Sequence, residues 1–424
     1  MICDVLVIGA GLLGLSSAYH IQRGNPGKRI VVIEMNPGPG QGNTAKSNAC
    51  FRNVFTSETN YLLSNSTIDW FKHLQRDGDD IYLSWIGYLW LYSERQYSEL
   101  EGAFRAMEAR GIDFSVLNRE EVREKIPQLS VDKCYGDGVL GELEPVDLAV
   151  LGEKCGSLDS DALCRAYESR LEALGGEIHY STKAKRLMLE PEIELGIPGE
   201  PFVWQEAHIK GAETERGEIE AETTVVATGA WSEGLMNPIG LDPFMRAKKR
   251  QIFVFKDPRL EGLFDVEGLN SLGVLPMTIL PMGGIHFKPQ LGERSIWLGC
   301  ADELGREFQF EPEPEPEMSY YTENVYYILR EYFPCFSDVR PINMWAGHYA
   351  INSFDGIPLV EKSPGLIYVG AASGSGVMKC DALGRIASAL YGGEEYAELY
   401  GGAQFKVSDI GIAKRNVEKE GFIL

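Results

Sequence analysis

The sequence lacks the features that mark membrane-spanning, zinc-binding and nucleic-acid-binding proteins. No continuous apolar run reaches the roughly 18 residues of a membrane span. The 8 cysteines include no C-x-x-C pair, which argues against a zinc ribbon or a thioredoxin-type redox site. Basic residues number 40 against 62 acidic ones, and the net charge of −22 disfavours contact with nucleic-acid phosphates. We therefore expect no nucleic-acid partner, no membrane span and no bound metal.

The sequence shows no positively charged leader before its first apolar segment, which begins near Cys3. We therefore expect a cytoplasmic protein whose cysteines are reduced and mostly buried. Its 424 residues suffice for two or three domains, and an apolar content of 44% is ordinary for a globular protein.

The first forty residues carry a strand–helix–strand pattern around a glycine-rich turn. Residues 5–8 are apolar and mostly β-branched, as in a strand buried on both faces of a parallel sheet. A helical segment follows and ends near Gly24, and a second buried strand covers residues 29–34. The intervening turn has the spacing G-x-G-x-x-G, with Gly9, Gly11 and Gly14. The pattern is a complete βαβ unit, which predicts a dinucleotide-binding site.

Each glycine of this turn has a physical role in that site. Gly9 allows the tight turn, Gly11 lets the backbone approach a pyrophosphate, and Gly14 lets the helix pack closely on the strand. The helix N-terminus offers N–H donors to the phosphates. Glu34, about 20 residues after Gly14, would accept hydrogen bonds from an adenosine ribose, so the predicted ligand is FAD or NAD rather than NADP. The adjoining members of the predicted site are Leu12, Leu13 and Met35.

Three later stretches extend the pattern. Residues 156–187 read as a helix and then a strand, and residues 222–232 as a strand that runs into the sequence ATGAW. Residues 365–390 read as a strand, a glycine-rich loop and a helix. In this order the motifs resemble the family of FAD-dependent amino-acid oxidases and dehydrogenases that includes D-amino-acid oxidase, glycine oxidase and sarcosine oxidase. The resemblance covers nearly the whole chain and favours FAD over NAD.

The resemblance implies an α/β fold with two parts. One is a doubly wound, Rossmann-like FAD-binding domain, expected from residues 1–50, 150–236 and 344–424. The other is a discontinuous α+β substrate domain on a mixed or antiparallel sheet, expected from residues 51–149 and 237–343.

The resemblance also implies which residues contact FAD. The segment GNTAKSNACFRNVF, residues 42–55, matches the one that family members place beside the pyrophosphate and flavin. The loop that begins at Gly370 would present backbone groups and a helix N-terminus to the flavin ring. The expected contact residues are Ala45, Lys46, Ser47, Asn48, Ala184, Ala227, Thr228, Gly229, Trp231, Gly347, Gly370, Gly374, Ser375, Gly376, Val377 and Met378.

Three residues are expected to act on the substrate. Arg52 matches the arginine that faces the substrate carboxylate in sarcosine-oxidase-like members, although a surface or ion-paired arginine is the alternative. His348 stands roughly where sarcosine oxidases carry a cysteine bonded to the flavin, so we expect non-covalent FAD. His348 and Tyr349 would then line the substrate side of the flavin. The alternative for His348 is that it satisfies buried backbone groups.

The sequence departs from the family at two lysines. Trp297 aligns with the lysine that helps oxygen react in monomeric sarcosine oxidases, which favours a quinone, dye or electron-transfer protein over oxygen as acceptor. The carboxylate-binding lysine aligns with Met378, and Lys379 follows one residue later. Arg52 would therefore work alone, or with Lys379 or Tyr349. His286 is expected on the strand that forms the pocket floor, with a role left open.

The resemblance implies oxidation of the C–N bond of a small amino acid by hydride transfer to the flavin. L-Proline is the first expected substrate, because the chain looks most like dye-linked L-proline dehydrogenases and sarcosine-dehydrogenase relatives. Sarcosine or another N-methyl amino acid comes second, and glycine or D-amino acids third. An NAD-dependent dehydrogenase and a non-catalytic FAD-binding assembly factor are the rival interpretations. A homo- or hetero-oligomer is compatible with each of these.

Two charged segments have interpretations of their own. Lys248, Lys249 and Arg250 could attract anions, but a solvated charge run is the commoner case. The repeat EPEPEPE, residues 311–317, predicts an extended, exposed loop before a helix.

Overall fold

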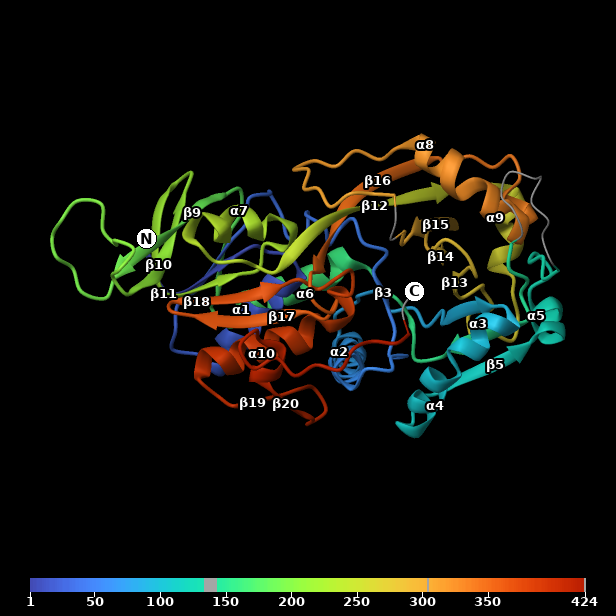
Figure 1. Cartoon of the computed structure of the whole chain (residues 1–424), viewed down its shortest axis with the longest axis horizontal. Helices are drawn as coiled ribbons and strands as arrows, with labels where there is room; N and C mark the ends of the chain where they lie inside the picture. Colours follow the sequence, from blue (N-terminus) through green and yellow to red (C-terminus); the bar gives the residue numbers. More distant parts are fainter. Residues whose placement is uncertain (133–142, 303–304, 423–424) are drawn as a thin grey trace.

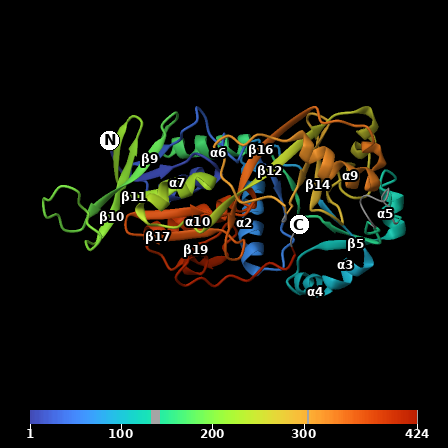
Figure 2. The same cartoon turned by 45° about the horizontal axis from the view of Figure 1, so that its top comes forward.

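The fold consists of two eight-stranded sheets, one in each half of an elongated molecule (Figures 1 and 2). The computed structural model describes residues 1–132, 143–302 and 305–422. Cys134, one of the thiols expected to be reduced, lies outside the described residues. The seven described cysteines are free, and six of them are buried.

The first sheet contains the predicted strand–helix–strand unit. Its strand order is β17-β18-β11-β1-β2-β8, and the hairpin of β9 and β10 extends from β11. The central strand β1 runs parallel to both β2 and β11, and its residues Val5, Leu6 and Val7 are fully buried, as the sequence predicted. The strands are β1 (Ile2–Ile8), β2 (Ile30–Ile33), β8 (Glu177–His179), β9 (Ala184–Pro191), β10 (Ala207–Thr214), β11 (Gly217–Val226), β17 (Leu359–Ser363) and β18 (Leu366–Gly370).

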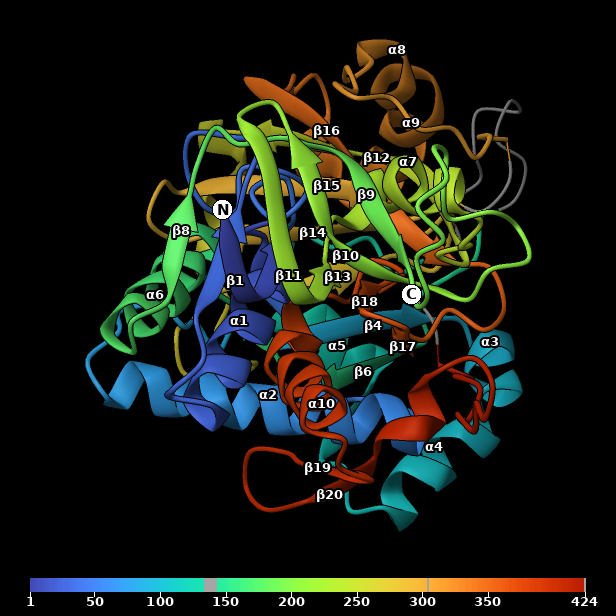
Figure 3. The ribbon, with the colours of Figure 1, turned by 90° about the vertical axis from the view of Figure 1, so that its left-hand side faces the viewer.

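The two faces of this sheet are covered differently (Figure 3). Helices α1 (Leu12–Gly24), α6 (Ser160–Ala173) and α10 (Cys380–Gly392) pack on one face. The opposite face, where a doubly wound sheet carries more helices, is covered by the β9–β10 hairpin and the short helix α7 (Ser232–Met236). The predicted α/β fold is confirmed, with a β layer in place of the second helical layer.

The second sheet is mixed, as the sequence predicted. Its strand order is β16-β12-β15-β14-β13-β4-β6-β5, and every pair is antiparallel except β13 with β4. Strand β16 belongs to this sheet through its pairing with β12, although the predicted division grouped residues 344–424 with the first domain. The strands are β4 (Tyr88–Tyr92), β5 (Phe114–Asn118), β6 (Leu148–Gly152), β12 (Met245–Phe255), β13 (Met277–Ile279), β14 (Ile285–Gln290), β15 (Ser295–Cys300) and β16 (Asn343–Asn352).

Helix α2 (Glu58–Arg76) lies beside α10 and contributes Leu63, Trp70 and Phe71 to the core of the first half. Ser57 caps its N-terminus by accepting a hydrogen bond from the N–H of Asn60. The remaining helices are α3 (Glu94–Glu99), α4 (Glu101–Ala109), α5 (Arg119–Lys125), α8 (Met318–Tyr320) and α9 (Tyr326–Tyr332). The remaining strand pairs are β3 (Cys50–Phe51) with β7 (Gly156–Ser157), and β19 (Tyr396–Glu398) with β20 (Gln404–Lys406). Among the described helices, none combines the length and the apolar character needed to cross a membrane.

Candidate functional site

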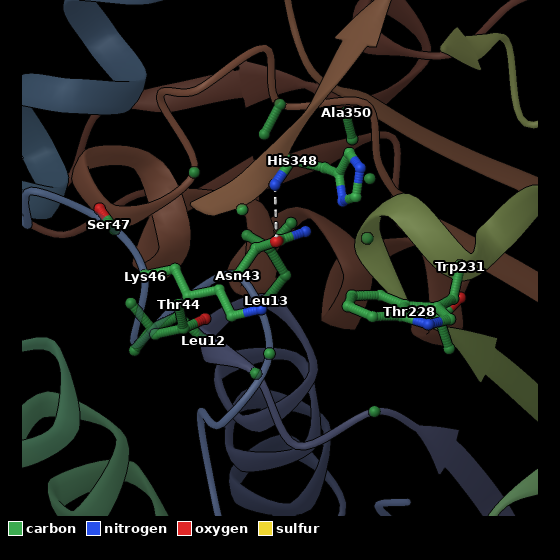
Figure 4. A pocket seen from close by; sticks show the side chains of 18 of the residues that line it. Leu12, Leu13, Asn43, Thr44, Lys46, Ser47, Thr228, Trp231, His348 and Ala350 are labelled. Carbon is green, nitrogen blue, oxygen red and sulfur yellow. Dashed lines mark hydrogen bonds between the residues drawn. The ribbon is translucent and has the colours of Figure 1, made fainter. Parts of the chain in front are cut away.

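A cavity of about 550 Å³ lies at the carboxyl ends of β1, β2, β11 and β18, where ligands bind in open α/β sheets. Strands β12, β14, β15 and β16 of the second sheet close its other side. The cavity is therefore built by both halves of the molecule. Figure 4 shows the segment after β2 and strand β16 meeting across it.

The glycine-rich turn cannot carry side chains at two of its positions. A Cβ on Gly14 would lie 1.9 Å from the carbonyl oxygen of Gly9, and one on Gly9 would lie 2.7 Å from that of Ala227. Gly9 also has a φ of +106°, which disfavours any L side chain. A Cβ on Gly11 would meet only Thr44 Oγ1, at 3.4 Å, so this glycine faces open space at the start of α1. The steric limits at Gly9 and Gly14 fit the tight turn and the close helix–strand packing, and the approach of a pyrophosphate to Gly11 stays a prediction.

Glu34 ties the ends of the two central strands together. One carboxylate oxygen accepts the N–H of Ala10 at 2.8 Å, and the other accepts the backbone and side-chain N–H groups of Asn36 at 2.9 and 2.7 Å. The residue lines the cavity at the end of β2. The carboxylate is thus fixed beside the glycine-rich turn, where the sequence placed an adenosine ribose.

The segment of residues 42–48 is joined to β16 by two hydrogen bonds. The backbone N–H of His348 donates to Oδ1 of Asn43 at 2.9 Å, which is the dashed line in Figure 4. The indole N–H of Trp345 donates to the carbonyl of Lys46 at 3.1 Å. Asn43 was missed in the sequence, although it lies within the quoted motif, because nothing in the motif indicates which strand its amide meets.

The C-terminal glycine loop packs tightly on the same strand. Gly374 has a φ of +81°, and a Cβ there would lie 2.3 Å from Cε2 of Tyr349. Tyr349 lines the cavity, its ring lies 5.4 Å from the guanidinium of Arg250, and burial raises the pKa of its hydroxyl. A glycine is therefore required at position 374 for Tyr349 to reach the cavity.

The structure brings most of the predicted site residues to this one cavity. The predicted residues that line it are Gly9, Gly11, Leu12, Leu13, Glu34, Met35, Lys46, Ser47, Asn48, Ala184, Ala227, Thr228, Gly229, Trp231, Gly347, His348, Tyr349, Gly370, Gly374, Gly376 and Val377. The predicted residues outside the lining are Gly14, Ala45, Arg52, Ser375 and Met378. Met378 packs into the apolar core beneath α10 instead.

His348 presents one ring nitrogen without a partner. Its Nε2 accepts the backbone N–H of Glu311 at 3.3 Å, so the proton of the neutral ring lies on Nδ1. Nδ1 is buried and has no partner among the described residues. Burial lowers the pKa of His348, which keeps the ring neutral. His348 therefore bonds a backbone group, as the alternative interpretation of this residue expected. Its Nδ1–H remains free to donate a hydrogen bond to a group bound in the cavity.

His286 of β14 and Gly299 and Cys300 of β15 line the cavity, whereas Trp297 does not. The Nδ1 of His286 donates to the carbonyl of Gly284 at 3.0 Å, and burial lowers the pKa of His286 to about 4, so the ring is neutral. Trp297 packs edge-on against Trp345, and the ammonium of Lys288 lies 4.8 Å from a Trp297 ring. The alignment that placed Trp297 in the cavity therefore needs correction.

Arg52 is buried beside the cavity rather than in its wall. Its guanidinium lies 4.2 Å from the centre of the Phe55 ring and donates to the carbonyls of Val54 and Phe422, at 2.9 and 3.3 Å. No carboxylate of the described residues lies within ion-pairing distance, and burial lowers its pKa. A surface or ion-paired arginine, the alternative considered for Arg52, does not fit this environment.

Lys379 lies against the same ring, with its ammonium 5.2 Å from the centre of Phe55. It donates to Oδ1 of Asn60 at 2.6 Å and to Oγ of Ser375 at 2.8 Å. Burial, together with the charge of Arg52, lowers its pKa to about 7. Lys379 thus lies beside Arg52. In the sequence it follows one residue after the position of the family's carboxylate-binding lysine.

Lys248 and Lys249 are buried and Arg250 is half-buried, so the interpretation of this run as a solvated charge run is wrong. Lys249 pairs with Glu317 at 2.9 Å, and Arg250 pairs with Asp302 at 2.8 Å. Glu317 and Asp302 thus neutralise the charges of Lys249 and Arg250 on β12. They are needed because the second sheet buries the inner face of that strand. Within the described residues, no group of three His, Cys, Asp or Glu side chains is placed to hold a metal ion.

The residues of the cavity fit FAD. The glycine cradle leaves no room for a Cβ at Gly9 or Gly14, the N-terminus of α1 faces the cavity, and Glu34 lines it at the end of β2, where a bound dinucleotide would place its ribose. The lining then continues through residues 46–48 to Tyr349 and Gly374 on the far side. The cavity therefore extends from Glu34 at the end of β2 to Tyr349 on the second sheet. This length suits an extended dinucleotide whose flavin ring would lie between the two sheets.

Comparison with known proteins agrees with this assignment. The chain is similar to the FAD-dependent oxidoreductase domain-containing protein 1 of Xenopus laevis, with 23% identity over 91% of this chain and 78% of the relative. It is 21% identical to monomeric sarcosine oxidase of a Bacillus species, over 78% of this chain and 77% of that protein. The crystal structure of L-proline dehydrogenase from P. horikoshii superposes with a TM-score of 0.74 at 20% identity, covering 96% of each chain.

The family assignment rests on a match over nearly the whole length. Residues 4–390 match the DAO family, described as FAD dependent oxidoreductase. This match excludes the NAD-dependent alternative, since the same strand–helix–strand unit serves FAD in this family. The chain belongs to the DAO family of FAD-dependent oxidoreductases.

Proposed function

We propose that this oxidoreductase removes two electrons from the C–N bond of a small amino acid. The observation that carries the proposal is the pair of buried cations Arg52 and Lys379, which lie against one ring beside the wall of the FAD cavity. Neither forms a direct ion pair with a carboxylate of the described residues, although the chain has 22 more acidic than basic side chains. The carboxylate of Glu420 stabilises the charge of both at longer range, so two buried cations share one acid. Buried charges in proteins are normally paired, so this excess of positive charge favours an anionic ligand.

The substrate carboxylate is proposed to lie between these two side chains. A guanidinium binds a carboxylate through two parallel N–H bonds, and an ammonium adds a point charge. Lys379 is connected through Ser375 to the glycine loop that lines the cavity, which places the carboxylate site next to the ring site. Carboxylate binding would therefore fix the α-carbon beside the cavity.

The residues that line the cavity would hold FAD, which would supply a hydride acceptor for the α-hydrogen, so that the amine would leave as an imine that water hydrolyses. The chain's own residues orient the amine and keep the pocket dry. His348 and Tyr349 line the cavity from β16, and the unpaired Nδ1–H of His348 offers a hydrogen bond to a bound group. No strong side-chain base is required if the amine enters deprotonated. We propose that FAD is held without a covalent bond, so acid precipitation should release the flavin into the supernatant.

L-Proline is the first substrate that we propose, sarcosine or another N-methyl amino acid the second, and glycine or a D-amino acid the third. The likeness to an L-proline dehydrogenase fold and to sarcosine oxidases supports this order. We propose a quinone, dye or electron-transfer protein as the acceptor, because the β14 side chain in the cavity wall is the neutral His286. Lys288, the buried cation of that strand, does not border the cavity.

The test is an anaerobic bleaching screen of the yellow holoprotein with L-proline, sarcosine, glycine and D-alanine. Bleaching by one of them supports the proposal, and repetition in air with a peroxide assay separates an oxidase from a dehydrogenase. Bound FAD that none of these compounds bleaches would favour the non-catalytic assembly factor instead.

A further inference from the structure

The last described residue of the chain, Phe422, contacts Arg52. The C-terminal segment reaches this point between the two halves of the molecule (Figure 1). Arg415 anchors the start of this segment through two bonds to Asp355, at 2.7 and 2.8 Å. Beyond Arg415, residues 416–422 form neither helix nor strand, and most of them are exposed. The segment is therefore a short tail fixed at its base by Arg415 and held further along by Glu418, Glu420 and Phe422.

Glu420 holds the tail at the N-terminus of α2. One carboxylate oxygen accepts the N–H and hydroxyl of Thr56, at 2.9 and 2.6 Å, and the N–H of Phe422 at 2.9 Å. The other accepts the N–H of Ser57 at 3.2 Å and the amide of Asn60 at 3.1 Å. A carboxylate is favoured there because the first N–H groups of a helix have no partner within the helix.

Asn60 connects this carboxylate to the proposed substrate site. Its side-chain N–H group donates to Glu420, and its carbonyl oxygen accepts from Lys379 at 2.6 Å. The side-chain amide of Asn60 thus bonds Glu420 of the tail and Lys379 in a single orientation. Docking of the tail and the position of Lys379 are coupled through this single side chain.

Phe422 completes the contact. Its carbonyl accepts from Arg52 at 3.3 Å, and its buried ring lies 4.9 Å from Trp90 and 5.6 Å from Phe104. The tail thereby supplies Arg52 with a neutral acceptor. A substrate carboxylate would form shorter, charge-assisted bonds with the same guanidinium.

We propose that residues 416–422 are a displaceable gate, which covers Arg52 in this structure and leaves when an amino acid's carboxylate binds. The inference rests on the proposed function of Arg52. The tail and the carboxylate compete for the same N–H group, so each weakens binding of the other. The affinity measured for a substrate is then its intrinsic affinity reduced by the fraction of molecules whose tail is released.

Kinetics of two tail variants test the gate. Glu420→Gln replaces an acceptor oxygen by an NH₂ group that faces other donors, so it should shift the equilibrium toward release. Loss of a charge-assisted bond is expected to lower KM for the amino acid about tenfold, with kcat unchanged or raised. Phe422→Ala should act in the same direction. Lys419→Gln, at an exposed side chain, is the matched control and should leave both constants unchanged. Glu420→Gln also removes a negative charge that acts on Arg52 and Lys379, so Phe422→Ala, which keeps that charge, is the decisive variant. A KM that rises or stays constant in Phe422→Ala would show a fixed wall and overturn the gate.

Limited trypsin digestion provides a readout that needs no turnover. Cleavage after Lys419 requires the tail to leave its site, and mass spectrometry of the holoprotein measures its rate. The rate should rise several-fold in Glu420→Gln and when saturating L-proline or acetate is added to the native protein. A rate that acetate and L-proline both leave unchanged contradicts the gate.

The two proposals fail in different ways. If no amino acid bleaches the flavin in any variant but acetate still speeds cleavage after Lys419, the amino-acid proposal is wrong and the gate stands as a carboxylate-sensitive device. If L-proline bleaches the flavin and neither KM nor cleavage responds to Glu420→Gln, the gate is wrong and the oxidation stands.

Discussion

Arg52 and Lys379 lie against the same aromatic ring, that of Phe55, at 4.2 and 5.2 Å from its centre. Arg52 comes from the segment after β3, and Lys379 from the turn that opens α10. Two cations brought this close repel each other, and the charge of Arg52 lowers the pKa of Lys379. Their proximity is costly in the free protein, and an anion bound between them would relieve it.

Removal of Arg52 should weaken substrate capture and leave FAD bound. We expect Arg52→Ala to raise KM for the amino acid about 10- to 100-fold, because charge-assisted hydrogen bonds to the carboxylate are lost. Arg52→Lys should also be impaired, since an ammonium cannot bind in the bidentate manner. Anaerobic flavin bleaching against substrate concentration measures the effect. Arg105→Ala, at an exposed arginine of α4, is the control, and native-like titration of Arg52→Ala would remove Arg52 from the site.

Carboxylate binding should depend on the protonation of Lys379. Burial and the charge of Arg52 lower its pKa to about 7, so it is charged below that pH and neutral above it. The inhibition constant of acetate, which has no amine to titrate, should therefore rise as the pH increases from 6 to 8. Lys379→Arg should abolish this dependence because a guanidinium stays charged. An identical pH profile in Lys379→Arg would assign the titration to another group.

The glycines of the first turn should respond differently to alanine. Gly14→Ala places a Cβ 1.9 Å from the Gly9 carbonyl, so we expect misfolding or a large loss of stability. Gly11→Ala meets only Thr44 Oγ1 at 3.4 Å, so the protein should fold but retain less FAD, because the added methyl group faces the phosphate path. Thermal unfolding and the ratio of flavin to protein absorbance separate the two. Full FAD occupancy in Gly11→Ala would show that the pyrophosphate does not approach this residue.

Asp381 should hold the helical layer together. Its buried carboxylate lies 2.6 Å from Nε2 of His20 and 2.6 Å from Nε of Arg385. Burial raises the pKa of Asp381, but the two partners lower it more, so the net shift is downward. Asp381→Asn should cost about 3–5 kcal/mol in urea unfolding near pH 7, because Arg385 is left unpaired.

The pH dependence of this loss follows from the lowered pKa. The stabilisation by Asp381 is complete above the usual pKa of an aspartate and is lost as the pH falls through the lower folded-state value. The difference between the native protein and Asp381→Asn should therefore narrow below pH about 4. Asp113→Asn, at an exposed aspartate, is the control, and a comparable loss in that variant would contradict a specific role for the pair.

Local sequence was sufficient for the βαβ unit and for most of the cavity lining. Gly9, Gly14 and Glu34 are constrained by contacts within one short segment or with the adjacent strand, so their spacing alone predicts their roles. The order of the later motifs carried the resemblance to the family, and that resemblance implied the α/β class.

The sequence was a poor guide wherever a long-range pairing sets which side chain faces inward. A strand exposes alternate residues, so a shift of alignment exchanges the residue in the cavity with one outside it. In this protein Trp297 lies outside the cavity that Gly299 of the same strand lines, and Lys248 and Lys249 are buried and Arg250 is paired with Asp302 rather than solvated. The bond from His348 to Asn43 likewise depends on how the two halves meet.

The amino-acid sequence by itself determined the dinucleotide turn and the strand–helix–strand order, because these follow from local spacing and steric requirements, and the order of its motifs carried the resemblance to an FAD-dependent family. Only the tertiary structure decided that Lys379 accompanies Arg52, and that Glu420 and Phe422 close over them. Those residues are far apart along the chain, and side chains distant in sequence meet only where the packing of the two sheets brings their elements together.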